Sequence, residues 1–266
     1  MFIKDNPIWH LHFNIMNNNR LTTIPLERFK IFSSSALKLI ACVSMLSDHI
    51  TKFYFYYYTK SAATWLTETL FTIAGRAISI QQLLLMFGRF AFPIFAFLLV
   101  VGFEKTHNRK KYGISLLIVA LLSELPFDLM IGHHFSFFRQ NVIFTLLFGY
   151  LAMCALNYFK GKPLMRLLSV VVVFLVCRVA RVDYGTTGFC FILIMYALRN
   201  QKAIQSVLGA SIMKMKLMVF LSFMVIYMFN GKKGFIKTKF WKYFFYAFYP
   251  VHMLIIYFLA RYCVPI

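Results

Sequence analysis

The sequence predicts an all-α polytopic membrane protein with about eight to nine transmembrane helices and a cytoplasmic N-terminus. Of its 266 residues, 61% are hydrophobic and 14% are charged, whereas a soluble domain has about 45–50% apolar and roughly 25% charged residues. This composition excludes a soluble enzyme and a disordered chain. The apolar residues stand in long runs rather than in alternation, which favours membrane helices over a transmembrane β-barrel.

The chain divides into a short polar tail and one membrane domain. Residues 1–35 are polar and rich in Asn, and we expect a cytoplasmic tail that ends in the potential N-cap Ser33-Ser34-Ser35. Residues 36–266 are predicted to form a single membrane-embedded domain. The first apolar run starts near Ala36 and is too long for the hydrophobic region of a signal peptide, so we interpret it as an uncleaved first helix.

Apolar segments of helical length follow one another through the membrane domain. They cover roughly residues 36–58, 79–103, 113–131, 141–159, 164–181, 186–198, 203–229 and 243–262. A membrane span needs about 20 residues, so most of these segments are single crossings. The stretch 203–229 is the exception, because two helices at roughly 203–213 and 217–229 would be too short to span and would form a hairpin buried in protein.

The loops indicate the orientation. The basic loops 104–112, 160–166 and 230–242 alternate with loops that carry few cations. Because Lys and Arg favour the cytoplasmic side, the N-terminus and these three loops are predicted to be cytoplasmic. The 230–242 loop reaches that side only if the stretch 203–229 turns back on itself, which gives nine segments.

The excess of cations indicates contact with membrane lipids rather than with nucleic acid. There are 29 Lys plus Arg against 8 Asp plus Glu, a net charge of +21. In a membrane protein such loops satisfy the positive-inside rule and touch anionic lipid, and part of the excess is available for an anionic cosubstrate. The five cysteines show no CxxC spacing, and the adjacent His133 and His134 would point apart on a helix, so we expect no metal site.

The acidic residues are few, so their positions are informative. Five of the eight lie in or at the ends of apolar segments: Asp48, Glu104, Glu124, Asp128 and Asp183. An ionisable group in hydrocarbon costs several kcal/mol and generally faces a protein cavity. At about 1.5 Å per residue, Asp48 and Glu124 both lie about 18 Å from the cytoplasmic edge, and Asp128 lies about 24 Å from it.

These depths predict a polar pocket in the outer half of the membrane. Glu124 and Asp128 share a helix face because they are four residues apart, and Arg89 lies in the middle of a neighbouring segment. Other polar residues lie at the outer ends of their segments or deep in the last one. The set expected to bind a substrate is Arg89, Glu124, Asp128, Asn141, Asp183 and His252. A helix-to-helix salt bridge and a buried core histidine remain open alternatives for single members of this set.

The adjacent pair Asp48-His49 is the strongest candidate for catalysis. An imidazole beside a carboxylate in a desolvated site meets the requirements of a general base. We therefore expect His49 to be the base or a transient acyl carrier, with Asp48 as its electrostatic support. Because adjacent helical residues point about 100° apart, Asp48 can instead pair with Arg89 or Lys52.

Motifs along most of the membrane domain resemble the TraX family. They are Leu37-Lys38-Leu39-Ile40-Ala41, Met45-Leu46-Ser47-Asp48-His49, Gly88-Arg89-Phe90-Ala91-Phe92-Pro93, Thr106-His107-Asn108-Arg109-Lys110-Lys111-Tyr112, Ser123-Glu124-Leu125-Pro126-Phe127-Asp128, Gln140-Asn141-Val142-Ile143, Asp183-Tyr184-Gly185, Asn230-Gly231-Lys232-Lys233-Gly234 and Phe245-Tyr246-Ala247-Phe248-Tyr249-Pro250-Val251-His252. They follow in order from about residue 36 to 260, and their specificity comes from the whole series.

The resemblance implies an activity. The best-known TraX protein acetylates the N-terminus of conjugative pilin, and the family is similar to the acyltransferase-three superfamily of membrane acyltransferases. Those enzymes carry a basic residue and a catalytic histidine eleven positions later, a spacing that Lys38 and His49 match. Lys38 stands where the superfamily usually has Arg, and lysine binds phosphate as a point charge rather than bidentately. The resemblance implies acetyl-CoA as cosubstrate, with its phosphates at Lys38, Arg109, Lys110 and Lys111.

We therefore predict a multi-pass acetyltransferase of the bacterial cytoplasmic (inner) membrane. It would transfer an acetyl group from cytoplasmic acetyl-CoA to an amine or hydroxyl of an extracytoplasmic or membrane-embedded acceptor, such as a pilin-like peptide, a glycan or a lipid head group. Two alternatives stay open. One is a proton-coupled transporter, because carboxylates and histidines inside membranes also form proton relays. The other is a non-catalytic factor of pilus or conjugation assembly.

Overall fold

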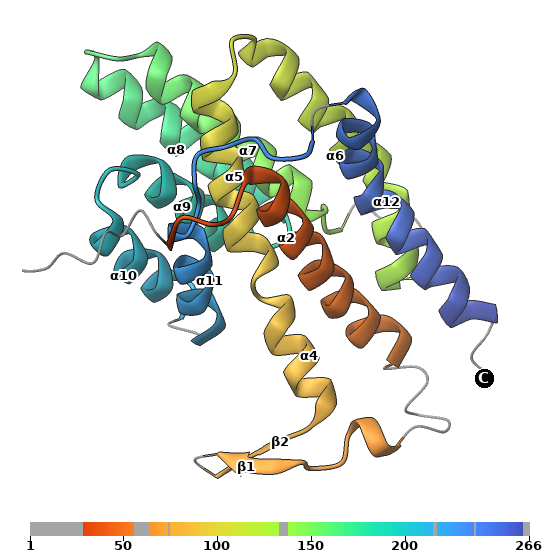
Figure 1. The fold of residues 1–266 in the computed structure, drawn as a ribbon. Helices are drawn as coiled ribbons and strands as arrows, with labels where there is room; N and C mark the ends of the chain where they lie inside the picture. Colours follow the sequence, from red (N-terminus) through yellow and green to blue (C-terminus); the bar gives the residue numbers. More distant parts are fainter. Residues whose placement is uncertain are drawn as a thin grey trace, which may run out of the picture.

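The computed structural model describes residues 29–55, 64–73, 75–132, 138–214, 217–236 and 238–262, and these form a helical bundle (Figure 1). Its α-helices are α2 (Ser34–His49), α4 (Ile80–Gly88), α5 (Ala91–Lys105), α6 (Arg109–Gly132), α7 (Val142–Tyr158), α8 (Pro163–Val179), α9 (Gly185–Ala197), α10 (Lys202–Ile212), α11 (Leu217–Tyr227) and α12 (Lys239–Tyr262). The predicted segments match these helices closely, because long apolar runs in lipid leave the backbone no other internal hydrogen-bonding pattern.

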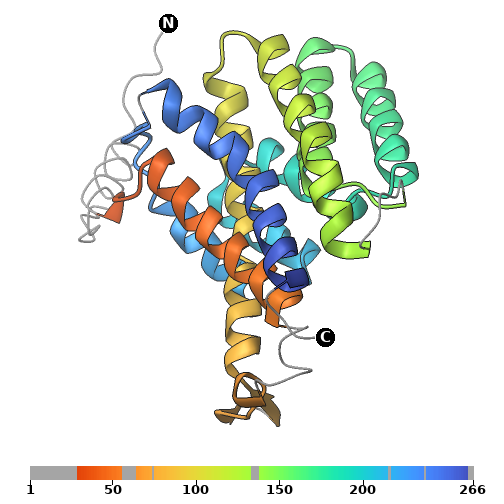
Figure 2. The same cartoon turned by 90° about the vertical axis from the view of Figure 1, so that its right-hand side faces the viewer.

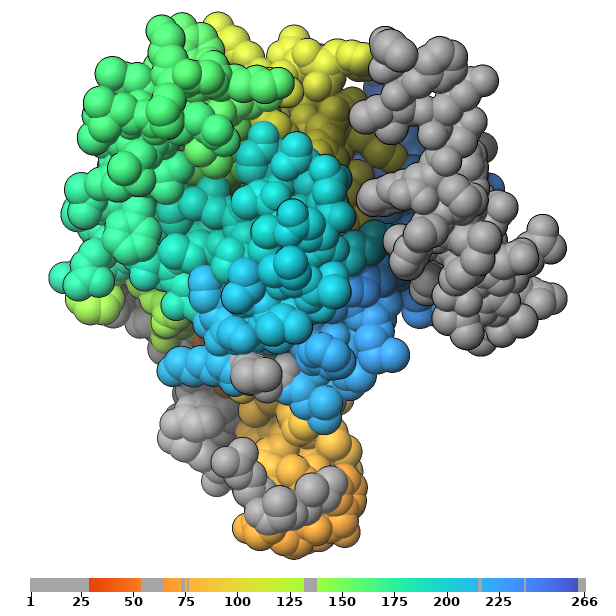
Figure 3. Space-filling view, turned by 90° about the vertical axis from the view of Figure 1, so that its left-hand side faces the viewer, coloured from red at the N-terminus to blue at the C-terminus, as the bar shows by residue number. Residues whose placement is uncertain are grey.

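The prediction of a purely helical fold misses a small hairpin. Strands β1 (Phe71–Ile73) and β2 (Arg76–Ile78) pair antiparallel, with Thr72 opposite Ala77. The 3₁₀ turn η3 (Thr64–Leu66) precedes them. The hairpin projects beyond the far end of α4, away from the body of the bundle (Figure 3).

Three helical runs among the described residues are long and apolar enough to cross a membrane. They are Ile80–Lys105, Arg109–Ile131 and Lys239–Tyr262. Shorter apolar helices cover Val142–Tyr158, Gly185–Ala197 and Leu217–Tyr227. The helix α5 is apolar on all sides, and it lies in the centre of the bundle, where Ile94 and Ala96 are fully buried.

The stretch 203–229 forms two helices, as expected. The helices α10 and α11 have 11 residues each, which is about 16 Å of helix against a hydrocarbon core of about 30 Å. They pack together where Gly209 meets the ring of Phe223. The described residues therefore contain a short helical hairpin at this position, inserted before α12.

The segment expected at 79–103 is one helical run with a break in the middle. The helix α4 ends at Gly88 and α5 begins at Ala91, with Arg89 as the C-cap of the first. Pro93 has no backbone N–H, so the carbonyl of Arg89 lacks the donor that a continuous helix would provide four residues later. The break falls at Arg89, which was expected to lie inside a continuous helix.

The loop 104–112 and the segment 230–236 meet at one end of the bundle, beside the start of α2. The amide of Ser34 donates to the carbonyl of Lys232 over 2.9 Å, and the Lys105 ammonium donates to the carbonyl of Gly231 over 2.6 Å. Gly234 has a φ of +83°, and a Cβ there would lie 2.3 Å from the Ser33 hydroxyl. Only glycine at position 234 therefore lets the segment 230–236 fold over the start of α2.

Some expectations concern residues outside those described. They are residues 1–28 of the polar tail, the histidines His133 and His134, and Cys263. The helices that matter most below, α2 and α12, run side by side in the same direction (Figure 2).

Candidate functional site

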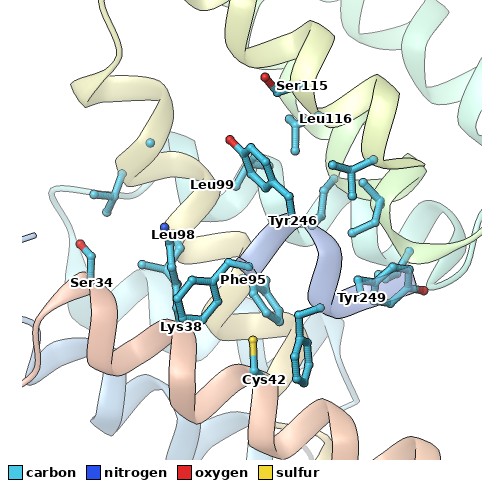
Figure 4. A pocket seen from close by; sticks show the side chains of 18 of the residues that line it. Ser34, Lys38, Cys42, Phe95, Leu98, Leu99, Ser115, Leu116, Tyr246 and Tyr249 are labelled. Atoms are coloured by element: carbon cyan, nitrogen blue, oxygen red, sulfur yellow. The ribbon is translucent and has the colours of Figure 1, made fainter. Parts of the chain in front are cut away.

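A cavity of about 640 Å³ lies between α2, α5, α6 and α12. Figure 4 shows Lys38 and Cys42 of α2 facing Phe95 of α5 and Tyr246 of α12 across it. Five lysines line one end, and we call this space the lysine cavity: Lys38, Lys105, Lys111, Lys233 and Lys242. Asp48 is the one acidic residue of the described chain that lines it. The cavity therefore presents strong positive charge at its mouth and apolar walls behind it.

Three separate parts of the sequence supply these lysines. Lys38 lies 5.7 Å from the centre of the Phe245 ring, and Lys242 lies 5.7 Å from the centre of the Tyr246 ring. Aromatic faces hold the two ammonium groups while leaving their N–H donors available. Lys233 reaches the cavity because its carbonyl accepts from the Ser35 hydroxyl over 2.6 Å, which fixes the 230–236 segment on α2.

Only part of the predicted phosphate-binding set lines the cavity. Lys38 and Lys111 do. The Arg109 guanidinium instead stacks over the Phe103 ring at 4.4 Å, and Lys110 is exposed to solvent outside the lining. Lys105, Lys233 and Lys242 line the cavity outside the predicted set, because only the fold brings the 230–242 loop and the end of α5 beside Lys38.

The deep end of the lysine cavity contains Asp48, Gly88, Tyr184 and Tyr249. The Asp48 carboxylate accepts from the Lys52 ammonium over 2.5 Å, one of the two partners that the sequence analysis allows. A Cβ on Gly88 would lie 2.4 Å from the Asp48 Cβ, so glycine is required where α4 crosses α2. Asp48 thus faces the cavity and Lys52 rather than the imidazole of His49.

His49 pairs with His252, and we call the two residues the histidine pair. The Nδ1 atom of His49 and the Nε2 atom of His252 lie 2.8 Å apart. The Nδ1–H of His252 donates to the carbonyl of Phe248 over 2.6 Å, so its Nε2 in the neutral ring is an acceptor. His49 then donates from Nδ1, and its own Nε2 keeps a free lone pair. His252, expected to bind a substrate, is bonded directly to the candidate base, and its substrate-binding role stays a prediction.

The backbone of α2 changes character directly after His49. The residues Ile50–Phe55 form the π-helical segment η2. The Thr51 hydroxyl donates to the carbonyl of Ser47 over 2.7 Å, which competes with the regular helical hydrogen bond at this point. Single π-helical turns inside helices often occur at functional sites. The wider turn begins one residue after the candidate base.

The histidine pair lies beyond the deep end of the lysine cavity and outside its lining. Lys38 and His49 are eleven residues apart, about three helical turns, and so lie on one face of α2. Two aromatic residues of α12 close the cavity before it reaches the pair. Tyr249 has its ring centre 6.3 Å from that of His49, and the Phe248 ring stacks on His252 at 4.8 Å.

The residues of the predicted outer pocket form separate pairs with different partners. Glu124 is 7% exposed, and its Oε2 accepts from the side-chain amide of Asn141 over 2.5 Å. That amide also donates to the carbonyl of Ala120 over 2.8 Å, while Asn141 caps α7 through the amide of Ile143. These bonds clamp α6 to the start of α7, and Asp128, also buried, lies one turn further along α6.

Asp183 lies at the same end as Asn141, as expected, but its partner is Arg139. The two charged groups lie 2.6 Å apart. The backbone of Asp183 donates to the carbonyl of Gln140 over 2.8 Å, and the Thr145 hydroxyl donates to the carbonyl of Asp183. The start of α7 and the start of α9 are therefore tied together.

Arg89, a member of the predicted substrate-binding set, lies apart from Glu124 and Asp128. Arg89 is exposed and lines a separate small pocket with Tyr184, Thr187 and Lys214. Within the part of the chain that the structure describes, it forms no ion pair with either carboxylate. Arg89 is the C-cap of α4, at the break between α4 and α5, and its side chain is exposed.

The family follows from the comparison of sequences. The sequence model described as TraX protein matches residues 33–260, which include the lysine cavity and the histidine pair. The chain belongs to the TraX family. A relative in Dichelobacter nodosus, described as the probable fimbrial assembly protein FimC of serogroup H1, is 25% identical over 256 residues and is covered over 94% of its length, against 85% of this TraX chain. No solved structure matches the chain.

Proposed function

We propose that this TraX chain is a polytopic acyltransferase of the bacterial cytoplasmic membrane. It takes an acetyl group from cytoplasmic acetyl-CoA and transfers it to an amine or hydroxyl of an extracytoplasmic or membrane-embedded acceptor. The observation that carries the proposal is the lysine cavity, which leads from five ammonium groups to the wall of the histidine pair. The kinship with the acyltransferase-three superfamily is part of the proposal.

The shape and charge of the lysine cavity suit a CoA thioester. Ammonium groups bind phosphate as point charges, and five of them line the mouth. The walls behind are formed by apolar residues of α5 and α6, which suits an extended arm of low charge. From Lys38 to Asp48 the cavity is about 15 Å deep, half of a hydrocarbon core of about 30 Å.

The chemistry falls to the histidine pair. The Nε2 lone pair of His49 removes the proton from the acceptor amine or hydroxyl as that group attacks the thioester carbonyl. The bond from carbon to sulfur breaks, and the leaving thiolate takes the proton from His49. His252 holds His49 in the required tautomer through the carbonyl of Phe248. The side chains of Phe248 and Tyr249 must turn aside for the thioester to reach Nε2.

The test is acetyl transfer in purified membranes. Membranes containing the protein are incubated with acetyl-CoA labelled in the acetyl group, and the labelled product is followed. We expect His49→Ala to lower transfer by about 10²–10⁴-fold, the usual loss for a general base. The matched control is His107→Ala, in an exposed loop outside the cavity lining. A folded His49→Ala protein that transfers acetyl within about threefold of wild type would refute the role of His49.

A non-catalytic role in fimbrial or pilus assembly is the second candidate function. The relative described as a probable fimbrial assembly protein favours it, and so does the position of His49 outside the lining of the lysine cavity. The same assay separates the two functions. An assembly factor would leave the acetyl label on CoA while its deletion still abolished fimbriae.

A further inference from the structure

A second cavity, about 730 Å³ in volume, lies on the other side of α12 from the lysine cavity. We call it the α2–α12 groove. It is lined by Leu46, Ile50, Phe244, Ala247, Phe248, Val251, His252, Ile255, Ile256 and Leu259. His252 is the only one of these residues with a polar side chain. The groove is thus an apolar slot with one half of the histidine pair in its wall.

We propose that the α2–α12 groove binds the hydrocarbon chain of a lipid-linked acceptor, which reaches His49 sideways from the bilayer. The inference rests on the proposed function and names the class of acceptor for it. A water-soluble acceptor would instead enter from the aqueous face near the hairpin.

The dimensions of the groove favour a single chain. From Phe244 to Leu259 it follows α12 for about 22 Å, most of a hydrocarbon core of about 30 Å. Its volume lies within the range of about 300–1,000 Å³ that is usual for ligand sites. A hydrocarbon chain is thinner than a transmembrane helix about 10 Å wide, so it can lie inside the groove along this length.

The groove opens to the lipid side. Val251 is 47% exposed and Ile255 is 53% exposed, and both lie on its rim. In a membrane-spanning helix these exposed apolar side chains face lipid rather than water. A chain from the surrounding bilayer can therefore enter without crossing a polar barrier, whereas the lysine cavity is entered past ammonium groups.

Phe248 connects the two spaces. Its side chain lines both the lysine cavity and the α2–α12 groove, and its ring stacks on His252. A donor in the first space and an acceptor in the second would therefore approach the histidine pair from opposite sides of one aromatic ring. The groove reaches the histidine pair at His252, so the two substrates would approach the pair by separate routes.

The first test fills the groove. In proteoliposomes of bacterial polar lipids with labelled acetyl-CoA, we expect Val251→Trp to lower label in the lipid fraction by at least about tenfold, with acetyl-CoA affinity within about twofold of wild type. The matched control is Leu122→Trp on α6, where the side chain is 65% exposed and outside both cavities. Undiminished lipid labelling by Val251→Trp, or label only on a water-soluble acceptor, would overturn the proposal. Altered preference for acyl-CoA chain length with acetyl transfer intact would assign the groove to the donor and also overturn it.

The second test does not depend on activity. A phospholipid with a diazirine in its acyl chain is added to the same vesicles and crosslinked by light. We expect crosslinks to concentrate on residues 244–259 relative to the lipid-facing surface of α6, and to fall in Val251→Trp. Equal crosslinking of both surfaces would overturn the groove assignment even if acetyl transfer occurs. If the wild-type protein shows crosslinks concentrated on residues 244–259 but transfers no acetyl group, the proposed function is refuted. The assignment of the groove to a lipid chain would then still stand.

Discussion

The hydrogen bond between His49 and His252 joins residues 203 positions apart in the sequence. It determines which imidazole nitrogen can act as a base, because the carbonyl of Phe248 fixes the proton of His252. Asp48, the residue next to His49, takes no part in these hydrogen bonds and instead pairs with Lys52. At the scale of single residues, the candidate base is therefore defined by α12 and not by its sequence neighbour.

This chain of bonds predicts a positioning role for His252. We expect His252→Ala to lower acetyl transfer by about 10² or more, since a misplaced tautomer costs up to about 10⁴ in the Ser-His-Asp triad. Gln at position 252 can still accept from the Nδ1–H of His49, so His252→Gln should recover part of that loss.

Nitrogen NMR of protein labelled in its histidines provides the check. The wild type should show His49 protonated at Nδ1 and free at Nε2, and His252→Ala should mix the two tautomers. An unchanged His49 signal in His252→Ala would contradict the positioning role.

The lysines of the cavity mouth yield a prediction with a close control. Lys111 lines the lysine cavity, whereas its neighbour Lys110 is exposed outside it. A charged hydrogen bond contributes about 1.5–3 kcal/mol, so Lys111→Ala should raise the Kd for acetyl-CoA about tenfold or more. Lys110→Ala should change it little.

Isothermal titration at two salt concentrations measures both effects. Wild-type affinity should fall with salt, because exposed phosphate contacts are screened. Equal affinities of the two variants would mean that the basic loop serves only to orient the chain in the membrane.

At the scale of helices, small residues allow the close contacts on which the site depends. The Ser44 hydroxyl donates to the carbonyl of Phe87 over 2.8 Å, and the Ser47 hydroxyl donates to the carbonyl of Leu84 over 3.2 Å. Gly88 completes this contact between α2 and α4 at the level of Asp48. Small residues and interhelical hydrogen bonds are the usual means by which membrane helices associate.

We therefore expect Gly88→Ala to separate α4 from α2. The new methyl group would overlap Asp48, and overpacking of this kind costs about 1–3 kcal/mol. Gly113→Ala is a suitable comparison, because its Cβ would come no closer than 3.2 Å to a neighbouring atom, against 2.4 Å at Gly88. Thermal unfolding in detergent should show a lower midpoint for Gly88→Ala than for Gly113→Ala. Equal midpoints would show that α2 and α4 tolerate a wider spacing.

The helices could be predicted from sequence far better than the directions of their side chains. Apolar runs fix where α6 and α12 begin and end to within a few residues. Depth from the membrane edge placed Asp48 and Glu124 at one level, but depth does not say which side of a helix a residue faces. Glu124 accepts a hydrogen bond from Asn141 on the next helix, and that contact depends on how α6 packs on α7.

The break at Arg89 illustrates the same limit. The mean hydropathy of the segment does not change because one backbone N–H is missing at Pro93, so hydropathy cannot predict the break. Arg89 lies at this break and is exposed rather than buried in the interior. Lys242 was missed for a related reason, since only the fold shows that the start of α12 lies beside Lys38.

At the scale of the whole molecule, following the helices in order shows at which end of the bundle each described basic loop lies. The loop 104–112 and the segment 230–236 are bonded to each other at the start of α2. The hairpin of β1 and β2 lies at the opposite end, beyond α4 (Figure 1). With α10 and α11 as a pair that returns to its starting side, α12 begins on the same side as α2.

This arrangement predicts that the cations face the cytoplasm and the hairpin faces outward. The check uses a variant without its own cysteines, to which one exposed cysteine is added at a time. A membrane-impermeant maleimide applied to intact cells should label Glu68→Cys, before the hairpin, and should leave Lys162→Cys, between α7 and α8, unlabelled until the cells are opened. Labelling of Lys162→Cys in intact cells would invert the orientation. The lysine cavity would then open away from the cytoplasmic pool of acetyl-CoA, and the proposed function would fail with it.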